Sequence, residues 1–253
     1  MIRRTRVIPV LLIHKGAVYK TIKFKNPQYI GDPKNAIRLF NDLEVDEIVV
    51  LDIDASKDNN NPNIQLIKEL ASEAFMPFSY GGGIKNIKHV KSILKCGVEK
   101  VILNHSIIQD VALLKSISNE IGSSGVVASV DYLNKWGNRQ FLFDHVTKKK
   151  YKINMVEHIQ KLQMFGVGEI ILNCVDNDGS MNGLDIETLK KIQESCEVPL
   201  IACGGAGTIS DLKDAESAGA SGIAAGSMFI YFGKQKGILI NYPKETSLRE
   251  SLK

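Results

Sequence analysis

Asp46-Glu-Ile-Val-Val-Leu-Asp52 leads, further along the chain, to Met76-Pro-Phe-Ser-Tyr-Gly-Gly-Gly-Ile84. The same order returns in the second half, where Gly168-Glu-Ile-Ile-Leu-Asn173 leads to Val198-Pro-Leu-Ile-Ala-Cys-Gly-Gly-Ala206. Each copy joins a short apolar run that ends in a polar residue to a second apolar run that ends in glycines. A pattern that occurs twice in this order indicates an internal repeat.

The spacing of the two copies is nearly constant. Glu47 and Glu169 lie 122 positions apart (169 − 47), and Gly81 and Gly204 lie 123 apart (204 − 81). A chance similarity in composition would not place both pairs of residues at nearly the same offset. We therefore expect two similar halves, each with about four strand–helix units.

Short apolar runs alternate with amphipathic stretches along the whole chain. The strand candidates are residues 7–13, 47–51, 77–79, 100–103, 126–130, 169–172, 199–202 and 222–225. The helix candidates include residues 63–74, 87–96, 111–121, 155–165, 185–195 and 209–218. This alternation is typical of parallel βα units. It predicts a single α/β domain over residues 1–253, a closed (β/α)8 TIM barrel with a two-fold half-barrel repeat.

Composition excludes several classes of protein. The chain is 44% hydrophobic and 24% charged, which is ordinary for a globular domain. No apolar run approaches the roughly 18 residues of a membrane span, and a charged segment follows the first apolar run where a signal peptide would have a cleavage site. The net charge is only +4 and no aromatic-interleaved basic patch accompanies it, so we expect no nucleic-acid binding. The run Lys148-Lys149-Lys150 is interpreted as a solvated turn.

Cysteine and histidine spacing predicts neither a metal nor an organic cofactor. The four cysteines form no CxxC pair, and the five histidines are scattered. Free thiols are typical of the reducing cytoplasm, which is the expected location.

Glycine clusters mark the carboxyl ends of three predicted strands, where the active site of such a barrel lies. They are Gly81-Gly82-Gly83, Gly204-Gly205 with Gly207, and Gly226-Ser227. Glycine lets backbone N–H groups approach an anion, and the last two loops are the usual phosphate site of this fold. Gly82 with Asn104 gives a matching site in the first half, so the pattern predicts a ligand with phosphate at both ends. The alternative is that these glycines only permit tight turns.

Aspartates also gather at these strand ends. Asp52 ends the second strand and Asp131 the fifth, whereas Asp176, Asp178 and Gly179 follow the sixth. Carboxylates at a barrel mouth suit proton transfer on a small anion, although helix capping or loop hydrogen bonding is the alternative for each. We expect Asp131 to be the acid/base group.

Four charges stand at the opposite ends of the strands: Arg6, Glu47, Lys100 and Glu169. Placed around the barrel bottom, they would form a ring of alternating sign. A buried charge ring stabilises poorly compared with apolar packing, so it indicates either a function or a fully satisfied structural network.

Taken together, these residues resemble the HisF family, the cyclase subunit of imidazole glycerol phosphate synthase. The resemblance extends from Arg6-Val-Ile-Pro9 to Phe229-Ile-Tyr-Phe-Gly233, and its most specific motifs are Leu51-Asp-Ile53, Gly81-Gly-Gly-Ile84, Asp176-Asn-Asp-Gly-Ser180 and Cys203-Gly-Gly-Ala-Gly207. It implies a bisphosphorylated substrate at the mouth, a HisH-type glutaminase docked at the bottom, and ammonia that crosses the barrel core. By the same resemblance, the four charges are the ammonia gate.

The sequence departs from this family at one catalytic position. The family uses two aspartates as acid and base, one ending the first strand and one ending the fifth. Asp131 matches the second, but the first position is occupied by Leu12. Loss of one positioned acid/base group typically costs about 10²–10⁴-fold in rate. His105 and Asp54 also stand where threonine is usual, and a carboxylate at residue 54 would repel a phosphate.

This combination resembles a side branch of the family, the WbuZ-like or second-copy HisF proteins linked to surface polysaccharides. The resemblance implies that the barrel supplies ammonia to a separate sugar-amidating enzyme. The alternatives are a working cyclase of histidine biosynthesis, a non-catalytic scaffold that activates a glutaminase, and an unrelated phosphosugar isomerase on the same fold.

Overall fold

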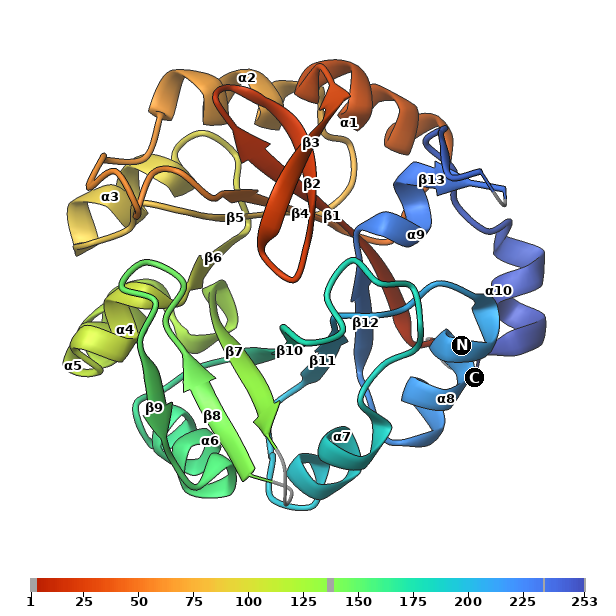
Figure 1. The fold of residues 1–253 in the computed structure, drawn as a ribbon. Helices are drawn as coiled ribbons and strands as arrows, with labels where there is room; N and C mark the ends of the chain where they lie inside the picture. Colours follow the sequence, from red (N-terminus) through yellow and green to blue (C-terminus); the bar gives the residue numbers. More distant parts are fainter. Residues whose placement is uncertain (1–3, 136–138, 234, 253) are drawn as a thin grey trace.

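Eight parallel strands close into a barrel in the computed structural model, which describes residues 4–135, 139–233 and 235–252. Around the barrel they are β1 (Arg6–His14), β4 (Ile48–Asp52), β5 (Phe78–Gly81), β6 (Lys100–Leu103), β7 (Val126–Lys135), β10 (Glu169–Cys174), β11 (Leu200–Cys203) and β12 (Gly222–Ala225) (Figure 1). Strand β12 pairs in parallel with β1 and closes the circle. The predicted (β/α)8 fold is confirmed.

Helices form the outer ring (Figure 1). They are α1 (Pro33–Asp42), α2 (Ile64–Glu73), α3 (Ile87–Leu94), α4 (His105–Gln109), α5 (Ala112–Ile121), α6 (Met155–Met164), α7 (Ile186–Gln193), α8 (Ile209–Ser217), α9 (Ser227–Ile230) and α10 (Glu245–Ser251), with a 3₁₀ turn at Ser123–Gly125. The predicted helical ranges exceed several of these by a residue or two at the ends. The reason is visible at α2 and α7, because the predictions included the N-cap residues Asn63 and Asp185, whose side chains accept the hydrogen bonds that begin the helix.

Three hairpins that the periodicity did not predict complete the structure. They are β2 (Ala17–Ile22) with β3 (Lys25–Gly31), β8 (Arg139–Phe143) with β9 (Lys150–Lys152), and β13 (Tyr231–Phe232) with β14 (Gly237–Ile238). The first two extend from the carboxyl ends of β1 and β7. In Figure 1, the turn of β2 and β3 reaches over the open end of the barrel.

The period of two along each strand separates two apolar cores. Val7 and Leu11 of β1 face the helices, whereas Ile8 and Val10 join a smaller cluster inside the barrel. Leu12 continues the inward series and packs against that inner cluster. The fold therefore directs residue 12 into the mouth, where its chemistry matters.

Within the described ranges, none of the helices has the length and apolar content needed to span a membrane.

Candidate functional site

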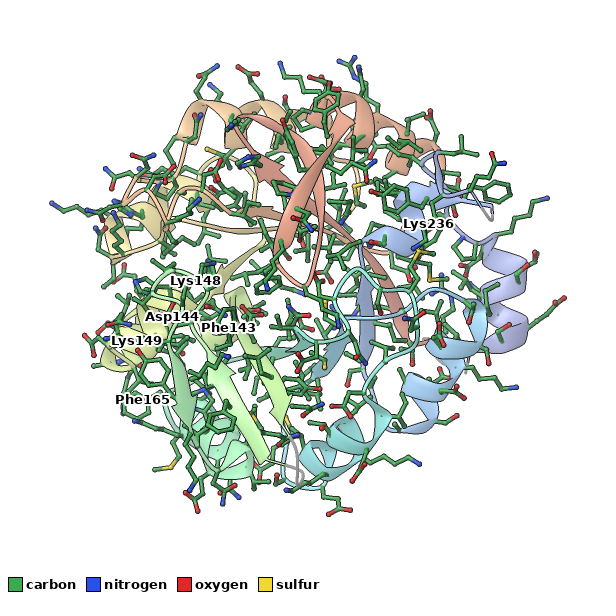
Figure 2. All side chains as sticks on the ribbon, in the orientation of Figure 1. Phe143, Asp144, Lys148, Lys149, Phe165 and Lys236 are labelled. Atoms are coloured by element: carbon green, nitrogen blue, oxygen red, sulfur yellow. The ribbon has the colours of Figure 1, made fainter. Side chains whose placement is uncertain are left out.

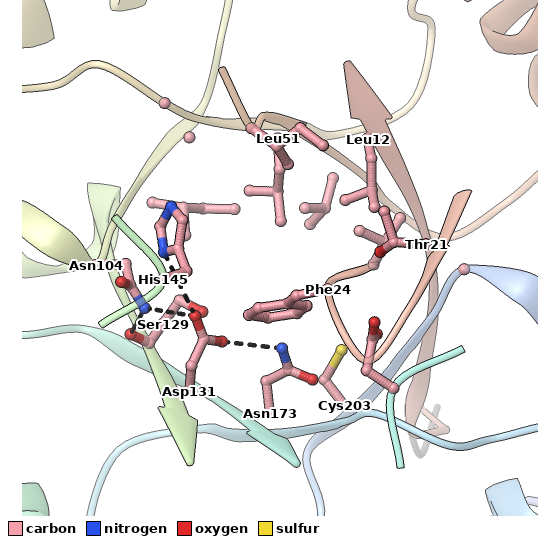
Figure 3. Close-up of a pocket in the computed structure, with 18 of the residues that line it drawn as sticks. Leu12, Thr21, Phe24, Leu51, Asn104, Ser129, Asp131, His145, Asn173 and Cys203 are labelled. Atoms are coloured by element: carbon pink, nitrogen blue, oxygen red, sulfur yellow. Dashed lines mark hydrogen bonds and ion pairs between the residues drawn. The ribbon is translucent and has the colours of Figure 1, made fainter. Parts of the chain in front are cut away.

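A cavity of about 340 Å³ opens at the carboxyl ends of the barrel strands (Figure 3). Ten of the residues expected to act there line it: Asp52, Gly82, Asn104, Asp131, Asp178, Gly179, Gly204, Gly205, Gly226 and Ser227. The structure thus brings both predicted phosphate loops and the predicted acid/base group to one cavity. Their roles in binding and catalysis remain predictions.

Asp176 is the exception among the predicted mouth residues. It does not line the cavity, and its Oδ2 instead accepts a hydrogen bond of 2.8 Å from the backbone N–H of Asn134. This contact ties the loop after β10 to the end of β7. The structure therefore does not bring Asp176 to the cavity with the other predicted residues, and its role in ligand binding stays a prediction.

Asp131 is buried between two side-chain amides. Asn104 Nδ2 donates to its Oδ2 at 3.0 Å, and Asn173 Nδ2 donates to its Oδ1 at 2.9 Å (Figure 3). Burial raises the pKa of Asp131 to about 7, although the two amides oppose the shift. A carboxyl group with that pKa exchanges protons readily at neutral pH, which suits a general acid or base.

His145 faces Asp131 from the turn between β8 and β9. Its Nδ1 lies 3.9 Å from Asp131 Oδ2, beyond hydrogen-bond distance, and is buried without a partner among the described residues. Burial lowers the pKa of His145 to about 4, so the ring is neutral at pH 7. Phe24 meets this ring edge-on, with the centroids 6.3 Å apart, and projects into the middle of the mouth (Figure 3).

The opposite side of the cavity is aliphatic. Leu12 and Leu51 lie together there (Figure 3), and both pack against the inner apolar cluster that includes Val10 and Val49. Leu12 and Leu51 are partners in the pairing of β1 with β4. Asp131 lies on the other side, with Asn104 after β6 and Asn173 on β10.

Lys20 is a cavity residue that the sequence analysis missed. It points inward from β2, is buried, and its Nζ donates to the carbonyl of Val10. Burial lowers its pKa to about 8 against the opposing attraction of Asp178, whose own pKa burial raises to about 6. The signal was a lysine at an alternating position between apolar residues, where a buried cation is uncommon.

The glycine loops of the two halves have matching geometry. Gly82 and Gly204 both have positive φ, of 131° and 91°. A Cβ at Gly82 would lie 2.6 Å from the carbonyl oxygen of Asp52, and one at Gly204 would lie 2.5 Å from that of Cys174. Each glycine is thus required for close packing against the end of another barrel strand, and this requirement accompanies any role in phosphate binding.

Asp52 and Asp54 make local contacts beside the first glycine loop. Asp52 Oδ1 accepts from the backbone N–H groups of Asp54 and Ala55, and burial raises its pKa. Asp54 lies 2.7 Å from Nδ1 of His14 and also accepts from the backbone N–H of Lys15. The carboxylate expected to repel a phosphate therefore has its own partners.

The four charges at the bottom form a closed ring. Arg6 contacts Glu47 at 2.6 Å and also pairs with Glu169, whereas Lys100 reaches the same two carboxylates at 3.1 and 3.0 Å. Ser79 adds a hydrogen bond to Glu47. The two glutamates have side chains only 3% and 7% exposed. The predicted ring is present, and every member contacts two of opposite charge.

Potential metal ligands do not cluster in the described part of the chain, where no group of three or more histidine, cysteine or acidic side chains has a suitable arrangement. The four cysteines are free.

Comparison with known proteins places this geometry in a family. The profile of the histidine biosynthesis protein family matches residues 6–236. A protein of Pseudomonas aeruginosa PAO1, named provisionally as imidazole glycerol phosphate synthase subunit hisF2, is 46% identical over 98% of this chain and 99% of its own. A provisionally named HisF subunit of Leptospira interrogans is 44% identical over 95% of both chains. The imidazole glycerol phosphate synthase subunit HisF of Petrotoga mobilis is 37% identical over 89% of this chain and 90% of its own. The chain therefore belongs to the HisF family of histidine biosynthesis proteins.

Proposed function

We propose that this chain is a synthase subunit that receives ammonia from a HisH-like glutaminase at the barrel bottom and serves the amidation of a nucleotide sugar in polysaccharide biosynthesis. One observation carries the proposal. The charge ring at the bottom is complete, whereas Leu12 stands at the mouth where the family has a catalytic aspartate. The bottom has the parts for ammonia entry, and the mouth lacks a part for the family's cyclisation.

The interior between the two ends supports passage of a neutral molecule. Above the ring the barrel is filled by apolar side chains, among them Ile8, Val49, Ile102 and Ile171. An apolar interior penalises an ammonium ion far more than uncharged ammonia. Proton exchange would then occur at the ring and again at Asp131.

The glutaminase is the partner to test first. A HisH-like glutaminase from the same source, mixed with the purified chain, should form a complex and hydrolyse glutamine severalfold faster than alone. Arg38 and Glu73 form an exposed pair on the helical surface, so Glu73→Gln serves as the control and should leave the stimulation unchanged. Absence of both complex and stimulation would contradict the proposal.

Transfer of nitrogen separates ammonia delivery from simple activation. With glutamine labelled with ¹⁵N at the amide and the sugar-amidating enzyme present, the label should enter the nucleotide sugar even when unlabelled ammonium is in excess. A non-catalytic scaffold would stimulate the glutaminase, but the label would be diluted into the bulk ammonium pool.

A working cyclase of histidine biosynthesis is the second candidate. The raised pKa of Asp131, about 7, and the two glycine loops at the same cavity favour it. It would require another group, such as a neighbouring carboxylate or a water molecule, to replace the proton transfer that Leu12 cannot perform. Turnover of the bisphosphorylated ribotide with ammonium salt distinguishes it from the leading proposal.

A further inference from the structure

A second group of polar and charged side chains lies beside the charge ring at the barrel bottom. Its members are Arg4, Asp46, Tyr242 and Glu245, and we call it the outer clamp. We propose that the outer clamp positions Arg6 and Glu47, and that it thereby keeps the ring closed to ammonia from bulk solvent. The role of the ring in ammonia entry rests on the proposed function.

The outer clamp holds the peptide groups on both sides of Arg6. Arg4 Nη1 donates to the carbonyl oxygen of Thr5 at 3.2 Å, and Asp46 Oδ2 accepts from the backbone N–H of Val7 at 2.8 Å. These two groups belong to the peptide bonds that precede and follow Arg6. The backbone that carries this arginine is therefore fixed from both sides, independently of its contacts within the ring.

Strand pairing does not supply the connection between the starts of β1 and β4. The parallel pairing of these two strands begins at Val10, so the first residues of β1 have no ladder partner on β4 and pair with β12 instead. Asp46 bridges this gap, because it directly precedes Glu47 in the sequence and also binds the backbone of Val7. The clamp thus connects the two strand starts at which Arg6 and Glu47 lie.

Arg4 joins the clamp to α10 through two ion pairs. Its guanidinium contacts both carboxylate oxygens of Asp46, at 2.6 and 2.8 Å, and it also pairs with Glu245 of α10. A bidentate contact of this kind fixes the relative geometry of the two groups. The Arg4 side chain is only 9% exposed, so solvent screens these contacts less than it screens pairs on the open surface.

Tyr242 closes the clamp from outside the barrel. The chain passes Lys236, which Figure 2 labels, on the turn between β13 and β14, and the segment that follows reaches the barrel bottom. There the hydroxyl of Tyr242 donates to the carbonyl oxygen of Val7 at 2.9 Å and lies 3.3 Å from Asp46 Oδ2. The tyrosine ring packs against Phe229, with the centroids 5.4 Å apart. The hydroxyl can therefore be removed while the ring packing stays.

The ring depends on where the clamp places Arg6. This arginine contacts both Glu47 and Glu169, so a shift of its backbone would strain two ion pairs at once. A ring whose ion pairs separate more often would admit ammonia from the surrounding solution. Loosening of the clamp should therefore make delivery less selective for nitrogen that comes from glutamine.

Arginine side-chain NMR tests the positioning role on the isolated chain. Rotation of the Arg6 guanidinium about its Nε–Cζ bond is slow while both Nη groups hold carboxylates, and ¹⁵N exchange measurements report its rate. Tyr242→Phe should make this rotation about fivefold faster, the factor typical of one lost hydrogen bond. Tyr29→Phe, at an exposed tyrosine of β3, is the matched control and should leave the rate unchanged. The chain has six arginines, so single substitutions assign the signals.

A conservative variant separates positioning from a general loss of stability. Asp46→Asn keeps an oxygen that can accept from Val7 but loses the charge that Arg4 contacts, whereas Asp46→Ala loses both. The Arg6 rotation rate of Asp46→Asn should therefore lie between those of the natural chain and Asp46→Ala. Urea unfolding checks that each variant is folded. A residue that only stabilised the fold would lower the unfolding midpoint without changing Arg6 rotation in the folded molecules.

Nitrogen transfer tests the consequence for ammonia. With ¹⁵N-glutamine, the glutaminase, the sugar-amidating enzyme and an excess of unlabelled ammonium, Tyr242→Phe should raise the share of unlabelled nitrogen in the product roughly twofold or more, in line with one lost hydrogen bond. Tyr29→Phe should give the same share as the natural chain.

Two results would overturn the proposal. One is an Arg6 rotation rate in folded Tyr242→Phe equal to that of the natural chain. The other is faster rotation without further dilution of the label, because the clamp would then have no effect on ammonia. Full dilution with the natural chain would instead contradict the ammonia-delivery proposal. The Arg6 measurement needs neither glutaminase nor ammonia, so it still decides whether the clamp positions the ring.

Discussion

The two ends of the barrel hold buried charge in opposite ways. At the bottom, each of the four ring residues meets two partners of opposite charge. At the mouth, Asp131, Asp178 and Lys20 have strongly shifted pKa values, and buried polar atoms of Thr21, Asn104, His145 and Asn173 lack partners among the described residues. Buried polar groups in a finished structure are normally hydrogen-bonded. At the bottom every charge of the ring is paired, whereas the mouth holds buried polar atoms without partners among the described residues.

Removal of one charge from the ring at the barrel bottom should have the largest effect, a loss of folding stability. Glu169→Gln leaves Arg6 and Lys100 with Glu47 as their only remaining carboxylate in the ring. Removal of one partner from a buried ion pair typically costs about 3–5 kcal/mol. Urea unfolding of the variant should show a decrease of that order in the free energy of unfolding. A decrease below about 1 kcal/mol would mean that water reaches the ring and screens it.

Restoring a carboxylate at the aliphatic side of the mouth tests the other end. Leu12→Asp supplies a second acid/base group across the cavity from Asp131, and such a group contributes about 10²–10⁴-fold to a rate. We expect ribotide turnover with ammonium to rise at least about 100-fold over the natural chain. Leu12→Asn introduces a side chain of the same size as the aspartate but without an ionisable group, and it should show no increase in turnover. Equal rates for both variants would place the defect elsewhere, in the phosphate loops.

The pH dependence of stability tests the state of Asp131. Burial raises its pKa in the folded chain to about 7, whereas an unfolded aspartate titrates near pH 4. Between these values the folded state binds more protons than the unfolded state, so stability is lost as the pH rises. Asp131→Asn removes this loss. Relative to the natural chain, the variant should gain about 1–3 kcal/mol between pH 4 and pH 8, as measured by chemical unfolding. A difference that is independent of pH would show that Asp131 is ionised like an exposed carboxylate.

Removal of a surface ion pair should have the smallest effect on stability. It serves as the reference for the Glu169→Gln prediction. Arg38 and Glu73 are in contact at 2.6 Å, but their side chains are 58% and 26% exposed. Solvent screens exposed ion pairs, so they contribute little to stability. Glu73→Gln should therefore change the free energy of unfolding far less than Glu169→Gln in the same urea experiment. A loss as large as that of Glu169→Gln would remove the contrast between buried and exposed charge.

Sequence patterns predicted the barrel because its signals are local and repeated. The strands are short apolar runs between amphipathic helices, and the constant offset between Glu47 and Glu169 revealed the two halves. The hairpins were not predicted because apolar and polar residues do not alternate regularly in their sequences. In β3 (Lys25–Gly31), most positions are exposed and polar, so no apolar face marks the strand.

The site was predictable where a residue's position on a strand decides its direction. The glycine loops lie at strand ends and Asp131 directly follows the apolar run of β7 (Val126–Lys135), and the barrel brings these positions together. The direction of Asp176 could not be predicted because a loop residue's direction depends on the segment it contacts, here the backbone of Asn134. Lys20, Phe24 and His145 were missed for a related reason, since they reach the mouth only through the unpredicted hairpins.

The most direct test of the account is the turnover of the family's bisphosphorylated ribotide by the purified chain with excess ammonium salt. The account predicts that the folded chain consumes the ribotide no faster than Asp131→Asn, because Leu12 leaves the mouth without the second acid/base group. Turnover at an ordinary enzymatic rate, about 1 s⁻¹ or more and abolished by Asp131→Asn, would contradict it and assign the chain to histidine biosynthesis.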